Sequence, residues 1–315
     1  MTRLIIILPC FNEAESLEKT VETVDGLIQE LIDKKLVTHD SYALYVDDGS
    51  TDETWALILR FSQSSSRVQG IRLSSNAGHQ LALAAGMQEA NGKCDACVSI
   101  DADLQQDPKA IEQFLSRMRD GAEVVYGVRQ DRSTDGFFKY SLANVFYFLA
   151  RHIGVKLVRG HADYRLLSAK ALSIACRFAE SDPFYRGIIP LIGLRSDIVE
   201  FEVKPREFGV SKYSFSKMVR LALTGITSFS IIPLRLIGAL GVLVLFVSLL
   251  LTFYVLLVRL FTDSAVPGWA SIVVPIYMLS GIQMISLSVI GEYVGRIFLE
   301  VKGRPPFVVW EKTYD

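Results

Sequence analysis

Two carboxylates spaced two residues apart, Asp101 and Asp103, follow the apolar run 96–100. In an extended segment this spacing places both side chains on one side, with Ala102 on the other. Two carboxylates held close together repel each other unless a cation joins them. A hard divalent ion, Mg²⁺ or Mn²⁺, shared with a diphosphate would be the simplest such cation. We therefore expect Asp101 and Asp103 to be metal ligands; capping of a solvated turn is the alternative for this pair.

Two further apolar runs end in polar residues. Residues 9–13 follow the run 4–8, and the acidic segment 47–52 follows the run 42–46. Carboxylates there could accept hydrogen bonds from a base or a ribose, although turn chemistry explains Gly49 and Ser50 equally well. Ligands of open α/β sheets bind beyond the carboxyl ends of the strands, so the three segments predict one site. Neither GxGxxG nor GxxxxGK[ST] occurs, so dinucleotide redox chemistry and P-loop hydrolysis have no support.

The elements that must position these residues alternate between strand and helix over residues 1–210. Short runs rich in β-branched residues predict strands, and longer helical patterns separate them. This alternation predicts an α/β catalytic domain with a parallel sheet covered by helices on both faces. The expected strands are 4–8, 42–46, 68–73, 96–100 and 123–126, and the expected helices are 13–36, 52–63, 79–91 and 108–119.

Two uncharged stretches, 236–258 and 269–290, each exceed the about 20 apolar residues that a membrane-spanning helix needs. We expect a C-terminal transmembrane hairpin, with two buried core helices as the alternative. Segment 211–235 mixes basic and apolar residues and predicts an amphipathic juxtamembrane helix or a soluble helix leading into the span. Basic residues flank the outer ends of both spans, and this pattern predicts that the catalytic domain, both termini and the tail 291–315 lie in the cytoplasm. We therefore expect a multi-pass protein of the plasma (inner) membrane.

The composition narrows the function classes. The formal net charge is −1, so no global positive field exists to attract nucleic acid. Half of the residues are hydrophobic and the mean hydropathy is +0.31, too apolar for a disordered chain. Cys94 and Cys97 form a lone CxxC without further ligands at zinc-binding spacing, and we interpret them as thiols in or beside a buried strand.

Four motifs resemble glycosyltransferase family 2: ILPCFNEAESL (7–17), VDDGSTD (46–52), NAGHQLALAAG (76–86) and DADLQQDP (101–108). Further features are similar to the polyprenyl-phosphate glycosyltransferases, namely bactoprenol glucosyltransferases and relatives of dolichyl-phosphate mannose synthase. These features are the two apolar stretches described above, the segment FYRGIIPLIG (184–193) and the segment GEYVGRIFLEVKGRPPF (291–307). The resemblance implies a GT-A fold, which is a Rossmann-like nucleotide-sugar domain. The QxxRW motif of processive synthases does not occur, which counts against that branch.

The resemblance also implies roles for single residues. The nucleotide-contacting set would be Pro9, Phe11, Glu13, Val46 and Asp48, and the set near the metal, diphosphate and sugar would be Asp101, Ala102, Asp103 and Gln105. Arg129 is similar to an arginine that holds the acceptor or donor phosphate. The basic loop 204–212 resembles a segment that closes over the donor, with Arg206 and Lys212 as phosphate contacts. Asp163 lies near a further motif, and we expect it to be catalytic without assigning its role.

The expected reaction is inverting transfer of a hexose, glucose or N-acetylglucosamine favoured, from a UDP-linked donor to polyprenyl (undecaprenyl) phosphate. A phosphate monoester is largely ionised at pH 7, so this acceptor needs no general base. The metal would offset charge on the leaving diphosphate, and Arg129, Arg206 and Lys212 would offset the incoming phosphate. The alternatives are a membrane glycan synthase with a hydroxyl acceptor and a non-catalytic nucleotide-sugar-binding subunit. Glycines in the spans would permit a homo-oligomer.

Overall fold

The computed structural model describes residues 1–129, 161–178, 180–202 and 269–314, together with scattered positions between 237 and 253. The chain divides into two compact units. The first comprises Met1–Met218 with Arg304–Asp315, and the second comprises Val219–Gly303. The candidate site lies entirely in the first unit.

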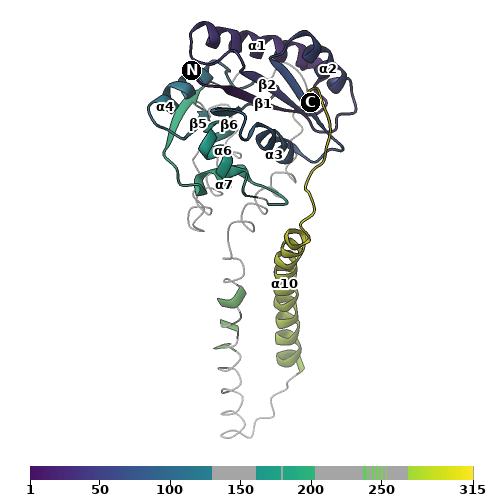
Figure 1. The fold of residues 1–315 in the computed structure, drawn as a ribbon. Helices are drawn as coiled ribbons and strands as arrows, with labels where there is room; N and C mark the ends of the chain where they lie inside the picture. Colours follow the sequence, from purple (N-terminus) through teal and green to yellow (C-terminus); the bar gives the residue numbers. More distant parts are fainter. Residues whose placement is uncertain are drawn as a thin grey trace, which may run out of the picture. The chain divides into compact units, whose positions relative to one another are not determined.

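One eight-stranded mixed sheet forms the centre of the first unit, with the order β7-β5-β6-β4-β1-β2-β3-β8 (Figure 1). Strands β1 to β4 pair in parallel, as expected. The expectation of an entirely parallel sheet is wrong, because β6 runs antiparallel to β4 and β5, and β8 runs antiparallel to β3. The bounds of the strands are β1 Leu4–Cys10, β2 Tyr42–Asp47, β3 Val68–Leu73, β4 Ala96–Ser99, β5 Val124–Arg129, β6 His161–Ser168, β7 Ser196–Phe201 and β8 Val309–Lys312.

Helices cover both faces of this sheet. Figure 1 shows α1 and α2 on one side and α3, α6 and α7 on the other. Leu17, Val21, Val24 and Ile28 recur at helical spacing on α1, and they pack in one core with alternate residues of β1. The bounds are α1 Ala14–Asp33, α2 Thr54–Ser64, α3 His79–Ala90, α4 Ala110–Arg119, α6 Ala169–Ala175 and α7 Tyr185–Leu191.

Helix α3 approaches the sheet closely because Gly86 has no side chain. A Cβ at this position would lie 2.5 Å from Ile7 Cγ2 and 3.0 Å from Val46 Cγ2. The close approach matters for the site, because the first turn of α3 carries two polar residues, His79 and Gln80, beside the carboxyl ends of the strands. Packing of small residues therefore determines where the start of this helix lies.

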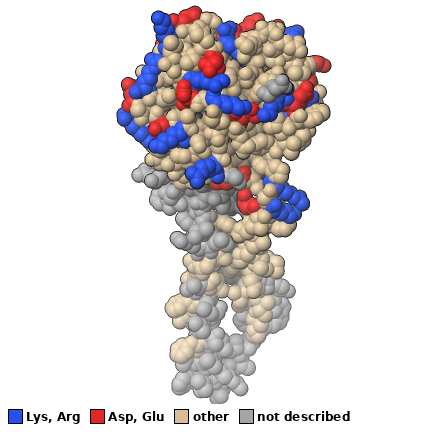
Figure 2. All heavy atoms as spheres, in the orientation of Figure 1, with Lys and Arg blue, Asp and Glu red and all other residues tan. Residues whose placement is uncertain are grey.

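The second unit contains the helix α10, Trp269–Lys302. Ile282–Lys302 is the one described segment that is long and apolar enough to cross a membrane. The described residues of α10 are uncharged over most of its length (Figure 2). The helix continues past the expected end at 290, so part of the expected tail 291–315 is helical and another part is strand β8. The expected first span, 236–258, lies largely outside the described residues, and the two-helix hairpin is not confirmed.

Candidate active site

The carboxyl end of β4 leads into a tight turn rather than an extended segment. Strand β4 ends at Ser99, and the Leu104 N–H donates a hydrogen bond of 3.2 Å to the Asp101 carbonyl. The expectation that Asp101 and Asp103 alternate with Ala102 along a strand is therefore wrong. Leu104 adopts φ 50°, a left-handed conformation that costs a non-glycine residue about 1 kcal/mol or more. Backbone strain of this kind is frequent at functional sites.

Asp101 is held in place by Gln106. Gln106 Nε2 donates to Asp101 Oδ2 at 2.6 Å, and the Asp101 N–H donates to Gln106 Oε1 at 3.0 Å. The side chain of Asp101 is 37 % exposed, and its Oδ1 lies 3.7 Å from His79 Nε2. Burial is the main cause that raises the pKa of Asp101; His79 opposes the shift, and Asp163 and Asp103 add to it. A bound cation would remove this cost of ionising Asp101.

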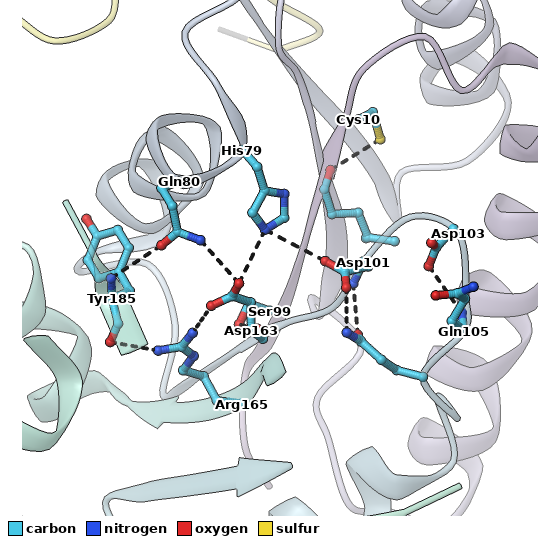
Figure 3. Close-up of polar contacts among 12 residues, drawn as sticks. Cys10, His79, Gln80, Ser99, Asp101, Asp103, Gln105, Asp163, Arg165 and Tyr185 are labelled. Carbon is cyan, nitrogen blue, oxygen red and sulfur yellow. Dashed lines mark hydrogen bonds and ion pairs between the residues drawn. The ribbon is translucent and has the colours of Figure 1, made fainter. Parts of the chain in front are cut away.

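Asp103 and Gln105 lie on the same turn, and the Gln105 N–H donates to Asp103 Oδ1 at 3.2 Å (Figure 3). Among the described residues, no group of three or more His, Cys, Asp or Glu side chains could hold a metal ion by itself. Magnesium in nucleotide enzymes is commonly bound by one or two carboxylates and completed by substrate phosphates and water. The carboxylates of Asp101 and Asp103 fit that kind of site.

Asp163 of β6 forms the second half of the site. Its backbone carbonyl accepts a hydrogen bond of 2.5 Å from Ser99 Oγ, which ties β6 to the end of β4. Its carboxylate accepts from Arg165 Nη2, from Arg186 Nη2 at 3.1 Å and from Gln80 Nε2 at 3.2 Å. Burial alone would raise the pKa of Asp163, but the charges of Arg186, Arg165 and His79 hold it well below its usual range. Asp163 is therefore a fixed negative charge and a poor proton acceptor.

His79 links the two halves. Its Nε2 lies 3.7 Å from Asp101 Oδ1 and 3.8 Å from Asp163 Oδ2, and Figure 3 shows the ring between the two carboxylates. The side chains of His79 and Arg186 are 44 % and 37 % exposed, so both are accessible. The arrangement places two accessible cationic or hydrogen-bonding groups beside an acidic turn. Chemically, the carboxylates of such a turn can interact with a cation, and the groups beside it can interact with an anion.

The loops after β1 and β2 are joined by hydrogen bonds into one surface. The Asn12 N–H donates to Ser50 Oγ at 3.0 Å, and Asn12 Oδ1 accepts from the Thr51 N–H at 2.9 Å. Asp52 Oδ2 accepts from the Ala14 N–H, the first residue of α1, at 3.2 Å. Gly49 lies at φ 65°, and a Cβ there would come within 2.6 Å of the Ser75 backbone. Only glycine lets this loop lie so close to the next one.

The structure places the expected nucleotide-contacting residues unequally. Pro9, Phe11 and Glu13 are partly exposed beside this surface. Asp48 is 3 % exposed, and its carboxylate already accepts from the Ala77 N–H at 2.7 Å and the Gly78 N–H at 2.9 Å. Val46 and Ala102 are buried, at 0 % and 4 % exposure, which leaves their side chains little surface for a ligand.

The expected phosphate-binding residues are only partly described. Arg129 is the last residue of β5 and is exposed. Arg206 and Lys212 lie outside the described residues. Sequence reasoning missed His79, Gln80 and Arg186 as members of the site. The motifs NAGHQLALAAG and FYRGIIPLIG contained them, but nothing local in either motif points to Asp163.

Cys97 lies in β4 and Cys94 lies just before it, and both thiols are buried and free, as expected of residues in or beside a strand. Burial raises the pKa of Cys94 to about 12. Both thiols therefore stay protonated at neutral pH and serve in the packing behind the site.

An α/β unit with an acidic turn after its fourth strand and accessible cationic groups beside it is typical of enzymes that handle phosphorylated ligands. Comparison with known proteins identifies the class: residues 5–173 match the model of glycosyl transferase family 2. The chain belongs to this family and is a glycosyltransferase, and its mixed α/β sheet agrees with the expected GT-A fold.

Two curated relatives cover nearly the whole chain. The uncharacterized glycosyltransferase YkoT of Bacillus subtilis strain 168 is 42 % identical over 99 % of this chain and 92 % of its own length. The SfII prophage-derived bactoprenol glucosyl transferase of Shigella flexneri is 34 % identical over 98 % of this chain and 97 % of its own length. Among solved structures, glucosyl-3-phosphoglycerate synthase of Mycobacterium tuberculosis, in complex with Mn²⁺, UDP-glucose and phosphoglyceric acid, matches with a TM-score of 0.47 and 17 % identity, covering 72 % of this chain and 78 % of that one.

Proposed function

We propose that the protein transfers a hexose from a UDP-linked sugar to a polyprenyl phosphate at the cytoplasmic face of a membrane, with glucose or N-acetylglucosamine as the sugar. The observation that carries the proposal is the juxtaposition of the Asp101–Asp103 turn with the cationic groups around Asp163. The relatives named as bactoprenol glucosyl transferases support the lipid acceptor, because they match this chain over nearly its whole length. The long apolar helix α10 supports attachment to a membrane.

In this proposal Asp101 and Asp103 hold the divalent metal, which would neutralise charge developing on the leaving diphosphate. Gln106 orients Asp101 by donating a hydrogen bond to its carboxylate and accepting one from its backbone N–H, so the carboxylate needs less reorganisation when the donor binds. The loops after β1 and β2 carry the partly exposed Phe11 and Glu13 and receive the nucleotide.

The acceptor phosphate is itself the nucleophile, since it is largely ionised at neutral pH. It needs cationic groups that reduce its repulsion from the donor diphosphate, and it needs no general base. Arg186 and His79 can provide hydrogen bonds to an anion from their exposed atoms. Asp163 keeps both in place and remains ionised, which fits a positioning role better than proton transfer. Arg129, Arg206 and Lys212 stay proposed as further phosphate contacts.

The test uses membranes that contain the full chain and a panel of radiolabelled UDP-glucose, UDP-N-acetylglucosamine and GDP-mannose. We expect label from one UDP-sugar in solvent-extractable lipid, and loss of this product in Asp103→Ala and after removal of divalent metal. Asp120→Ala is the matched control, because Asp120 follows α4 and lies outside the site.

Three outcomes contradict the proposal. Label that enters a polymer and never a lipid indicates a hydroxyl acceptor. Donor binding without any labelled product indicates a non-catalytic subunit. Undiminished transfer in the absence of divalent metal removes the role of the metal.

A further inference from the structure

The C-terminal strand β8 completes the catalytic sheet on the side of the nucleotide-binding loops. It pairs with the edge strand β3, and flanking hydrogen bonds join the Ser74 N–H to the Val308 carbonyl and the Thr313 N–H to the Gly70 carbonyl, both at 2.9 Å. Lys312 Nζ lies 2.6 Å from Glu89 Oε2 of α3. These contacts attach β8 to β3 and to α3 within the first unit.

Trp310 lies at an irregularity in this pairing. Arg72 pairs with Glu311 and Leu73 pairs with Val309, so Trp310 is an extra residue on β8. A β-bulge of this kind turns a side chain out of the regular alternation. The Trp310 indole is 66 % exposed, and its ring centre lies 5.1 Å from the guanidinium carbon of Arg72. Trp310 therefore gains little from burial of apolar surface, and its ring makes a cation–π contact with Arg72.

Arg72 contacts both Trp310 and Asp47, the last residue of β2. The centre of the Trp55 ring lies 6.0 Å from the same guanidinium carbon. Arg72 Nε lies 3.3 Å from Asp47 Oδ2, and within the described part of the chain neither of these buried atoms has a hydrogen-bond partner. Asp47 is 0 % exposed, and this burial raises its pKa; hydrogen bonds from Ser50, and after them the positive charge of Arg72, oppose the shift and favour the ionised form. The direction of the Arg72 side chain therefore matters for the loop that Asp47 begins.

Asp47 in turn organises the surface that we assign to the nucleotide. Asp47 Oδ1 accepts from the Ser50 N–H at 3.2 Å, and Ser50 Oγ accepts from the Asn12 N–H at 3.0 Å. Phe11 and Glu13 flank Asn12. A continuous series of contacts thus runs from the C-terminal tail through Arg72 and Asp47 to both loops.

We propose that Trp310 is a positioning residue for the donor site, acting by holding Arg72 against Asp47 and thereby keeping the loops 10–13 and 47–51 ready for the nucleotide. The inference rests on the proposed function in that the ligand of these loops is the nucleotide of the donor. Strand β8 would then contribute to the enzyme's affinity for the donor as well as to its fold.

The test compares Trp310→Ala, Trp310→Phe and the control Lys312→Ala in the full chain in detergent. Lys312→Ala removes the contact with Glu89 and leaves the Arg72 contact in place. Titration calorimetry with UDP measures affinity, and hydrogen–deuterium exchange measures the protection of amides 46–52 without any ligand. We expect Trp310→Ala to weaken UDP binding about two- to fivefold, the fold-change that an exposed cation–π contact supplies, and to speed exchange in the loop. Trp310→Phe should retain most of both properties.

A double-mutant comparison separates this role from general loosening of the tail. In the Arg72→Gln background Trp310→Ala should have no further effect on either readout. The proposal is overturned if Trp310→Ala leaves loop exchange unchanged, or if Lys312→Ala alters both readouts as much as Trp310→Ala does. Failure of the wild-type chain to bind UDP would instead refute the proposed nucleotide, and loop exchange would still decide whether Trp310 positions the loop.

Discussion

Replacing Arg165 with Met should destabilise the protein strongly, because Arg165 and Asp163 form a buried ion pair. The side chains are 2 % and 8 % exposed. Breaking such a pair by removing one partner costs about 3–5 kcal/mol, since the remaining charge stays buried. Arg186 and Gln80 still contact Asp163, so we expect the lower end, about 3 kcal/mol. At about 2–4 °C per kcal/mol for a unit of this size, Tm should fall by about 6–12 °C.

The assay is thermal unfolding of the full chain in detergent, followed by circular dichroism. Arg60→Met is the matched control, because Arg60 pairs with Glu18 at 3.6 Å with both side chains exposed, and such pairs contribute about 1 kcal/mol or less. The double variant Asp163→Asn/Arg165→Met should recover much of the lost stability, because it removes the buried negative charge that has lost Arg165 as a partner. It should not recover sugar transfer, because Arg186 and His79 lose the charge that positions them.

A fall in Tm for Arg165→Met no larger than that for Arg60→Met would refute the reasoning. Equal Tm values for the single and double variants would also refute it, because the cost would then not come from the buried charge of Asp163.

Two further predictions concern a surface pair and a site cation. Arg67 forms a two-pronged ion pair with Asp25, which holds the pKa of Asp25 below its ordinary value of about 3.9. The ion pair contributes about 1 kcal/mol of stability at this partial exposure. This contribution is present above the ordinary pKa of Asp25 and is lost as the pH falls below it. The Tm difference between wild type and Arg67→Met should therefore be constant from pH 8 to 5 and shrink below pH 4. Arg186→Gln should reduce lipid-linked product by about tenfold or more while changing Tm by only a few degrees. The reason is that a charge-assisted hydrogen bond to phosphate contributes more than a neutral one. An unchanged transfer rate would show that Arg186 is not part of the site.

Much of the fold was predictable because its first half follows local patterns. The expected strands at 4–8, 42–46, 68–73 and 96–100 are confirmed to within about two residues, and so are the helices that begin near 52, 79 and 108. The position of Asp101 and Asp103 after the fourth strand is confirmed for the same reason. The turn at 101–104 was not predictable, because its left-handed Leu104 is imposed by surrounding contacts rather than by the residue type.

By itself the sequence determined the alternation of strands and helices, the family, and the acidic residues at the strand ends, because apolar periodicity and short motifs act over a few neighbouring residues. Only the tertiary structure brought Asp163 beside Asp101, through the antiparallel pairing of β4 with β6, and brought Trp310 onto Arg72, through the pairing of β3 with β8. Such pairings join residues far apart in the chain. They depend on backbone hydrogen bonds and packing between whole elements, and these terms leave no local pattern in the sequence.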